Sequence, residues 1–413
     1  MRILGLYCGI DWATTHHDIA ILDDEGKLVA RARVTNDAAG FALALTLLAE
    51  AGDSSDEPIP VAIETDRGLW VAALRATGRA IYPINPLAAS RYRARYQVSG
   101  AKSDAADAVL LANILRTDMA AHRPLPADSE AAQAIRVLAR AQQDAVWARQ
   151  QLGNQVRDLL KDYYPAALAA FADLPGGGLA RRDARTILTA APAPASAARL
   201  TRTQLRKLLT KAGRQRFIDR DIDRLREIFA DTYLHQPPQV EAAMGIQLAA
   251  LLRQFDAACT AADELAEAAI AHFDKHPDAK IITSFPGLGK LSGARVLAEI
   301  GDDRTRFADA RGLKAYAGSA PITRASGKKT VVLHRQIKNR RLTTTGSMWA
   351  LASLRASPGA RRHFDARRAV GDWNHQAQRH LFNKFLGQLF HCLQTGQLYD
   401  EHRAFPPPST AAA

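Results

Sequence analysis

Four acidic residues within the first 110 positions constrain how this chain of 413 residues can fold. Asp11 ends the apolar run ILGLYCGID, and Glu64 ends the run PIPVAIE. Asp104 and Asp107 lie three positions apart in SDAADAVLLANIL, so on a helix both point to one side. If these acids share one site, two strand ends and the start of a helix must lie together.

The first 125 residues alternate strand-like and helix-like patterns. Three strands are predicted in ILGLYCGID, HHDIAILDD and KLVARARV, with a turn at Gly26 before the last. Asn36 is expected to cap the next helix and Gly52 to end it. A strand up to Glu64, a short helix and a fifth strand at AIYPINP follow. This order predicts an α/β domain of the RNase H-like (RuvC-like) type over residues 1–125.

Long helices dominate the pattern of residues 126–277. Apolar positions recur at near-heptad spacing over residues 128–171, where Pro165 interrupts or bends the helix, and again over residues 240–273. The stretch 174–200 is rich in Gly, Pro and Ala and is interpreted as a connector. The two long helices could form an antiparallel coiled-coil hairpin, pair with another subunit, or belong to an ordinary helical bundle.

A third, mainly helical domain is predicted over residues 278–404. Its PGLG sequence at 286–289 makes a tight turn before a helix. This form resembles a helix-hairpin-helix, whose backbone amides meet a phosphate, although a simple Gly-rich turn has the same pattern. The remaining residues, 405–413, are rich in Pro and Ala and predict a disordered tail.

The bulk composition favours a polyanionic partner. The formal net charge is +13, and Lys and Arg that neutralise phosphates release condensed counterions. The apolar stretches are too short to span a membrane, so we expect no membrane partner. The three cysteines, Cys8, Cys259 and Cys392, offer neither a disulfide framework nor zinc spacing, which predicts a reducing, cytoplasmic compartment.

The four acids suit a divalent metal. Mg²⁺ prefers hard oxygen ligands, and a pair of such ions can activate the attacking oxygen and stabilise the leaving one at a phosphodiester. We therefore predict Mg²⁺, with Mn²⁺ as an alternative, as the cofactor at Asp11, Glu64, Asp104 and Asp107. Each acid alone could instead be a turn residue or part of a solvated helix face, and Asp18 and Asp66 are nearby acids that could substitute.

A basic segment without acids lies between Ala310 and Phe364 and contains twelve Lys or Arg residues. A solvated surface normally mixes both signs, so this segment favours a phosphate-binding surface. The predicted nucleic-acid contacts are Lys314, Arg324, Lys328, Lys329, Arg335, Lys338, Arg340 and Arg341.

Ser326 lies before Gly327 in a predicted cationic loop at the centre of this basic segment. Neighbouring cations would favour its hydroxyl as a nucleophile toward a phosphodiester. The alternatives are a Ser-Gly turn without chemistry, or Ser319 as the nucleophile. A tyrosine recombinase would need a late Tyr with Arg and His, and that scheme, which leaves the acids without a role, is disfavoured. Its candidates are His363, His375, Arg379, His380 and Tyr399.

These residues together resemble the DEDD-type insertion-sequence transposases of the IS-one-ten family, which are bridge-RNA-guided serine recombinases. The stretches GIDWATTHHDIAILDDEG, VAIETDRGLW and KSDAADAVLLANILR resemble the RuvC-like domain of that family, and LKAYAGSAPITRASGKK resembles its C-terminal transposase domain. The resemblance implies that Asp11, Glu64, Asp104 and Asp107 bind metal and that Ser326 forms a covalent phosphoserine link with DNA.

The resemblance also implies partners. They are donor and target DNA, a structured non-coding guide RNA, and a homodimer or homotetramer in which two subunits build one site. The chain departs from the family at Trp12, where a small residue is commoner, and at an extended segment around residues 176–198. Two other functions stay open: a junction nuclease of the RuvC type that uses water and leaves no covalent adduct, and a non-catalytic nucleic-acid-binding protein.

Overall fold

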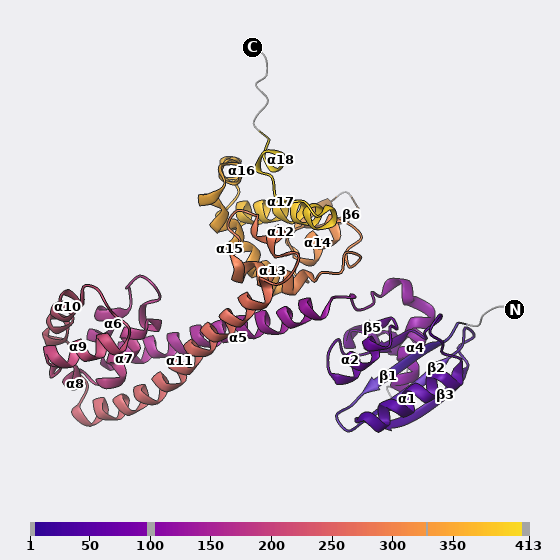
Figure 1. The fold of residues 1–413 in the computed structure, drawn as a ribbon, viewed down its shortest axis with the longest axis horizontal. Coiled ribbons are helices and arrows are strands. Elements are labelled where there is room, and N and C mark those ends of the chain that lie inside the picture. Colours follow the sequence, from indigo (N-terminus) through magenta and orange to yellow (C-terminus); the bar gives the residue numbers. More distant parts are fainter. Residues whose placement is uncertain (1–4, 97–103, 328, 407–413) are drawn as a thin grey trace, which may run out of the picture. The chain divides into compact units, whose positions relative to one another are not determined.

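The computed structural model describes residues 5–96, 104–327 and 329–406, which form two compact units, Met1–Ala127 and Asp128–Ala413 (Figure 1). The predicted tail from residue 407 onward, and Lys328, lie outside the described residues. Among the described residues, no helix combines the length and the apolar character needed to cross a membrane.

Unit 1 contains a five-stranded sheet in the order β3-β2-β1-β4-β5. Its strands are β1 (Tyr7–Trp12), β2 (His16–Leu22), β3 (Leu28–Thr35), β4 (Val61–Ile63) and β5 (Ile81–Pro83). The first three strands are antiparallel, whereas β4 runs parallel to β1 and β5 parallel to β4. The three leading antiparallel strands were predicted from alternation, and this mixed α/β order fits a RuvC-like domain.

Helices cover both faces of this sheet. They are α1 (Ala38–Ala51), α2 (Leu69–Ala76), α3 (Pro86–Tyr96) and α4 (Asp104–Asp118), followed by a 3-10 turn, η1 (Met119–Ala121). Cys8 and Ile10 of β1 pack with α1 and α2 on one face, and Ala62 of β4 packs with α3 and α4 on the other. Alternation along β1 therefore directs Asp11 toward the α3 and α4 face.

The start of α1 differs from the prediction by one residue. Asp37 caps the helix by accepting from the Gly40 amide, whereas the Asn36 side chain bonds His17 and the Thr14 carbonyl. An Asp side chain serves the same capping chemistry, so the local pattern did not distinguish the two positions. Gly52 ends the helix in the left-handed region, at φ 110°, as predicted.

Gly9 lets α4 lie directly against the sheet. A Cβ atom at this position would overlap the backbone of Ala108 and Ala112, and no small side-chain movement could relieve that overlap. Gly9 shares a face with Asp11, two residues further along β1. The missing side chain is therefore what allows the acidic start of α4 to approach the end of β1.

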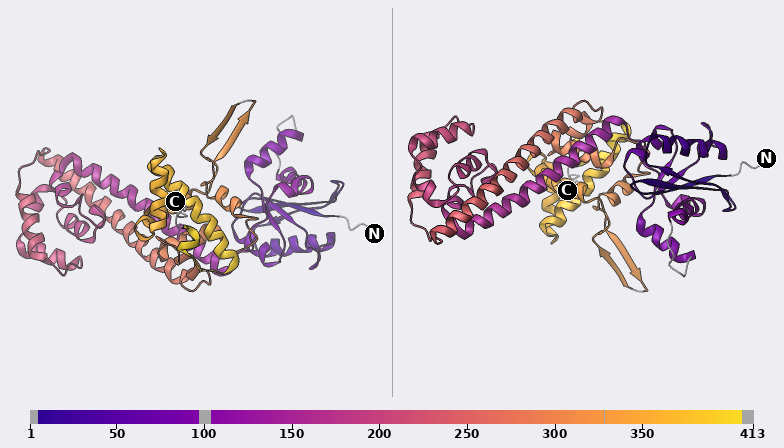
Figure 2. Two further views of the ribbon diagram at one scale, coloured as in Figure 1. Left: turned by 90° about the horizontal axis from the view of Figure 1, so that it is seen from above. Right: turned by 90° about the horizontal axis from the view of Figure 1, so that it is seen from below.

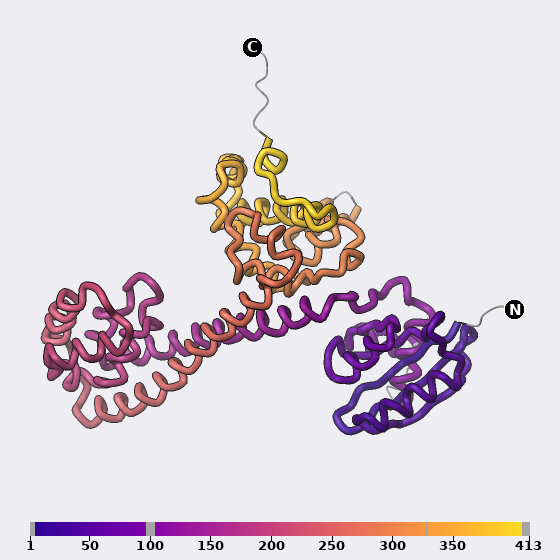
Figure 3. Tube along the Cα trace, in the orientation of Figure 1, coloured from indigo at the N-terminus to yellow at the C-terminus, as the bar shows by residue number. Residues whose placement is uncertain are grey.

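Unit 2 is organised by two long helices, α5 (Glu130–Tyr163) and α11 (Pro238–Phe273), which pack against each other (Figure 3). Arg149 lies beside Asp263, and Gly153 lies against the ring of Phe255, so the helices run antiparallel. The long helices were predicted, with the break at Pro165, whereas a coiled-coil geometry stays a prediction.

A lobe of short helices packs on the far end of this pair. It contains α6 (Pro165–Phe171), η2 (Gly178–Ala180), α7 (Arg182–Ala190), α8 (Pro194–Ala198), α9 (Arg202–Lys211) and α10 (Ile218–Ala230). Its core joins residues of α5 from Val156 onward to Leu248, Leu252 and Phe255 of α11. The prediction of a connector at 174–200 was wrong, because Ala184, Ile187 and Leu188 give α7 a buried face despite the surrounding Gly and Pro residues.

The C-terminal part of unit 2 is mainly helical, as predicted. Its helices are α12 (Ala279–Thr283), α13 (Lys290–Ile300), α14 (Ala310–Tyr316), α15 (Arg340–Ala356), α16 (Pro358–Ala369), α17 (Asn374–Thr395) and α18 (Glu401–Ala404). A hairpin of two strands, β6 (Ile322–Ser326) and β7 (Lys329–Leu333), was not predicted and projects from these helices (Figure 2). Phe405, assigned from the sequence to the tail, is instead buried in this core.

One buried carboxylate ties α5 to the C-terminal helices. Glu299 of α13 accepts two hydrogen bonds of 2.8 Å from Arg140 and one from Asn339. Burial alone would raise the pKa of Glu299, but these bonds hold it below its ordinary value. The start of α5 and the C-terminal helices therefore form one packed body.

Candidate functional site

Asp11 and Glu64 lie side by side at one end of the sheet. Ile10 of β1 pairs with Ile63 of β4 in a parallel ladder. Asp11 directly follows Ile10, and Glu64 directly follows Ile63. On the other side of β1, Asp11 lies opposite Asp18 of β2. Register and alternation thus bring carboxylates of three segments to the face that α4 covers.

The start of α4 adds the other two predicted acids. Asp107 is buried, and its carboxylate accepts a hydrogen bond from Arg93 of α3. Asp104, one turn earlier, is exposed and lies 3.7 Å from His16 Nε2 and 3.6 Å from Arg33 Nη2. The structure therefore places both acids at the same end of the sheet, with Asp107 nearer its centre.

The electrostatics of Asp11 show that the acids interact. Its pKa is raised from 3.8 to about 6, first because the carboxyl is partly buried and then because Asp107, Glu64 and Asp104 are negatively charged nearby. A cation between these groups would relieve that repulsion, and hard carboxylate oxygens are the ligands that Mg²⁺ prefers. The residues present therefore fit a divalent metal.

Two residues beside the four acids were not assigned to the site: His16, and Asp18, which was named only as an acid that could substitute. With Asp104 they form the one group of three among the described residues whose ligand atoms all lie within 4.8 Å of one another, so no three of the four predicted acids lie that close. Asp18 is buried and is held by Arg33 through hydrogen bonds of 3.1 and 2.8 Å, so its charge is already balanced. Strand alternation in HHD could have placed His16 on this face, because it lies two residues before Asp18.

Arg93 is the other residue that sequence reasoning missed. It belongs to the RYRARY stretch of α3, whose Tyr92 hydroxyl contacts the Asn113 carbonyl and Thr117 of α4. This contact fastens α3 to α4 and sets Arg93 beside Asp107. The alternating Arg and Tyr pattern was the available signal, but it gives no indication of which Arg turns inward.

Ser326 belongs to unit 2, at the tip of the β6–β7 hairpin. It is exposed and pairs with Lys329 across a turn in which Gly327 has φ 56°. Arg324 and Lys329 are exposed on the same hairpin and form no ion pair among the described residues. The segment expected to be a cationic loop is therefore a short hairpin that presents a hydroxyl between two free cations.

The other predicted basic contacts have varied surroundings. Arg340 is exposed, whereas Lys338 packs over Gly318 and beside His334, and burial and neighbouring cations lower its pKa. Arg341 donates to Asp144 at 2.7 Å and stacks over Trp147, so it holds α15 to α5.

The remaining two basic residues lie in more enclosed places. Arg335 Nε is buried with no hydrogen-bond partner among the described residues. Lys314 lines a cavity of about 490 Å³ together with Lys384 and Arg403.

The structure weakens two alternatives considered from the sequence. Ser319 is buried and donates a 2.9 Å hydrogen bond to Asn383, so it is not available as a nucleophile. Tyr399 donates to Glu401 and packs on Phe285, and burial and Glu401 raise its pKa. That environment is opposite to the one that activates a tyrosine.

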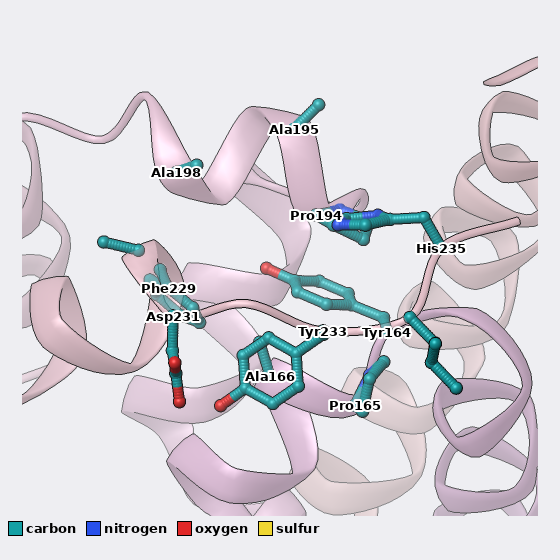
Figure 4. Close-up of a pocket in the computed structure, with 12 residues that line it drawn as sticks. Tyr164, Pro165, Ala166, Pro194, Ala195, Ala198, Phe229, Asp231, Tyr233 and His235 are labelled. Atoms are coloured by element: carbon teal, nitrogen blue, oxygen red, sulfur yellow. The ribbon is translucent and has the colours of Figure 1, made fainter.

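A cavity of about 180 Å³ lies in the lobe and is lined by none of the predicted site residues (Figure 4). Tyr164, Phe229 and Tyr233 line it with residues of α6 and α8. The candidate site is thus not an enclosed pocket but a set of acids at the end of the sheet.

Fold and acidic cluster together fit a domain of the RuvC-like class. A transposase model of the DEDD type of IS110 matches residues 8–165, and the model "Transposase IS116/IS110/IS902 family" matches residues 279–365. A protein named "Mini-circle putative transposase for IS117", from Streptomyces coelicolor, is 64% identical over 99% of both chains. The chain belongs to the IS110 family of transposases, which are enzymes that cut and rejoin DNA.

More distant relatives also align over nearly the whole chain. The "Insertion element IS900 uncharacterized 42 kDa protein" of Mycobacterium paratuberculosis is 27% identical over 99% of both chains. The "Insertion element IS110 uncharacterized 43.6 kDa protein" of Streptomyces coelicolor is 28% identical over 96% of both. Both family models leave out residues 166–278, which contain most of the lobe and α11.

Proposed function

We propose that Asp11, Glu64, Asp104 and Asp107 hold Mg²⁺ or Mn²⁺ and that the chain cuts DNA at this cluster. The convergence of these acids, together with the raised pKa of Asp11, carries the proposal. When bound, the metal would activate the attacking oxygen and stabilise the leaving one. The chain's own part is to fix the carboxylates on β1, β4 and α4 before the DNA arrives.

The direct test uses a buried and an exposed acid as a matched pair. Asp107→Ala removes a member of the cluster, whereas Asp56→Ala removes an exposed acid of the same unit that is not a candidate ligand. We expect Asp107→Ala to abolish both Mn²⁺ binding, measured by calorimetry, and cutting of supercoiled plasmid, and we expect Asp56→Ala to retain both. Equal loss in the two variants, or full cutting in EDTA by the parent protein, would refute a metal centre here.

A second candidate step, rejoining through Ser326, is favoured by the exposed hydroxyl at the tip of a cationic hairpin. In this step the Ser326 oxygen would attack the phosphorus and form a phosphoserine ester, and the bond to the 3′ oxygen of the cut strand would break. That oxygen would leave with a proton, and a reverse attack by a 3′ hydroxyl would restore the serine. The cations at Arg324 and Lys329 would stabilise the negative charge that develops.

Denaturing gels distinguish this step from hydrolysis by water. A covalent protein–DNA band that disappears in Ser326→Ala and persists in Thr323→Ala, an exposed residue of the same hairpin, supports the serine nucleophile. Cutting by Ser326→Ala with no covalent band in either variant supports the junction nuclease that uses water. The acidic cluster fits both outcomes, because each needs metal-assisted cutting.

The family resemblance supports further proposals on partners and domain roles. We infer a guide RNA that pairs with donor and target DNA, and a homodimer or homotetramer that combines the acids of one subunit with Ser326 of another. Residues 1–125 would cut, residues 126–277 would connect, and residues 278–404 would carry the serine. Sequencing of the RNA that copurifies with the protein tests for the guide RNA. The mass of the protein in solution tests for the homodimer or homotetramer.

A further inference from the structure

Phe217 is held in a strained and exposed conformation between α9 and α10. Its backbone lies in the left-handed region, at φ 58° and ψ 25°, and it is the one non-glycine residue with positive φ among the described residues. For a bulky aromatic residue this conformation is a genuine outlier that destabilises the fold locally. The side chain is 65% exposed, so burial does not offset the cost.

Local folding gives no reason for a phenylalanine at this position. Phe217 occupies the position before the first turn of α10, where Asp, Ser or Asn would cap the helix and Gly would adopt the positive φ without strain. The next residue, Ile218, packs on the core of the lobe, but Phe217 does not belong to that core. The strain therefore presents an aromatic ring to solvent.

One cation lies over the ring, and other basic residues are close to it in the sequence. The Arg220 guanidinium lies over it, 4.8 Å from the ring centroid, and Lys211, Arg214 and Arg216 are in the same stretch of chain. Arg214 is paired with Asp221 of α10, whereas Lys211 and Arg216 form no ion pair with any described residue. An exposed aromatic ring among unpaired cations can stack on a nucleic-acid base while the cations hold the neighbouring phosphates.

We propose that the Phe217 loop, residues 211–220, binds DNA at unpaired bases, with the Phe217 ring stacked on one base. The loop lies outside both matched family models and contains none of the predicted site residues. DNA is the partner because the family cuts and rejoins DNA, and strand exchange leaves bases unpaired. The proposal rests on the proposed function only in this choice of DNA.

A protein partner fits the loop less well. Docking Phe217 into an apolar groove would also bury Arg216 and Arg220 next to it, and buried cations without partners are costly. Phosphates next to the stacked base would instead neutralise these charges. A contact between two copies of the chain is thus the competing outcome that the experiment must detect.

The test exploits the strain itself. Phe217→Gly removes the ring and also relieves the positive φ, so we expect a higher unfolding midpoint together with a loss of affinity of about tenfold for a fluorescent single-stranded oligonucleotide. If Phe217 served only the fold, its replacement would change the unfolding midpoint and the DNA affinity in the same direction. Phe217→Trp keeps an aromatic ring and should retain binding, whereas Phe217→Leu should lose it.

Leu234→Ala is the matched control, because Leu234 is a 92% exposed apolar residue of the same lobe. We expect its affinity to be unchanged, and we expect Phe217→Gly to bind duplex DNA as the parent does. Unchanged affinity of Phe217→Gly, an equal loss in Leu234→Ala, or an effect confined to RNA would overturn the proposal. So would a shift in self-association without a change in DNA binding.

All binding is measured on the full chain in EDTA. The result is then independent of the acidic cluster, because no metal is available to it. If Phe217→Gly binds single-stranded DNA as the parent does while metal-dependent cutting is intact, only the loop proposal is refuted. If Phe217→Gly loses affinity but cutting does not depend on metal, only the metal centre is refuted.

Discussion

At the scale of single residues, Asp11 stands out because its charge is unfavourable in the fold. Its pKa is raised to about 6, so the folded state binds a proton that the unfolded state releases near 3.8. Stability from this group is therefore fully present below pH 4 and is lost as the pH rises through about 6.

Asp11→Asn should therefore separate stability from function. In EDTA at pH 7.5 we expect its free energy of unfolding to exceed that of the parent by about 1 kcal/mol, after allowance for partial exposure. Near pH 4 the two should agree. Urea denaturation at both pH values measures this difference, and a variant less stable than the parent at pH 7.5 would contradict it.

Cutting should follow the opposite trend with pH. Because metal binding requires the ionised carboxylate, we expect cutting by the parent protein to rise with pH through about 6, and Asp11→Asn to be at least about 100-fold slower at any pH.

Gly9 controls the approach of α4 at the same scale. Gly9→Ala would drive a methyl group into the backbone of Ala108 and Ala112, so we expect a loss of about 2 to 3 kcal/mol in stability and a large loss of Mn²⁺ affinity. Gly289→Ala adds the same methyl group where nothing lies within 4 Å and should change neither quantity much. Thermal unfolding and calorimetry follow the two effects.

At the scale of elements, alternation and acid positions predicted the leading strands, the strand that ends at Glu64 and the helix of Asp104. Those signals are local, because side chains alternate along a strand and recur on a helix face. The approach of α3, which brings Arg93 to Asp107, depends on a tertiary contact of Tyr92 and could not be deduced from the sequence.

The β6–β7 hairpin was missed for a related reason. Its residues are largely exposed, so its strands lack the buried alternation that marks a strand, and the turn at Ser326-Gly327 was interpreted as a loop. Helices α7 and α8 were missed because Gly and Pro at 175–194 hid the short buried face of α7.

The β6–β7 hairpin is expected to bind DNA phosphates through its positively charged side chains. Arg324→Gln and Lys329→Gln should each weaken DNA binding and reduce the slope of log affinity against log salt by about 0.9 per lost phosphate contact, with no effect on thermal unfolding. Arg341→Gln should instead lower the unfolding temperature and leave the slope unchanged. The Arg341 guanidinium is hydrogen-bonded to Asp144 and stacked over Trp147, so it contributes to stability. Fluorescence anisotropy over a salt series checks both.

At the scale of the whole molecule, the division into units separates the acids from most of the basic surface. The sheet core of unit 1 closes within residues 1–127, and Asp128 begins the contacts of unit 2. A fragment of residues 1–127 should fold, bind Mn²⁺ through the acids and bind DNA at least about tenfold more weakly than the full chain. Circular dichroism and calorimetry test this, and an unfolded fragment would show that the units are not independent.

The α5–α11 pair serves both ends of unit 2, since the lobe packs around Val156 and Phe255 and the C-terminal core around Ile135 and Phe273. With 34 residues, α5 is about 50 Å long, which is close to the length of about fifteen base pairs of duplex. The helix pair would therefore set the distance between two DNA contacts, one at the Phe217 loop and one at the β6–β7 hairpin. Shortening both helices by whole turns would then change the spacing of these two contacts along the DNA.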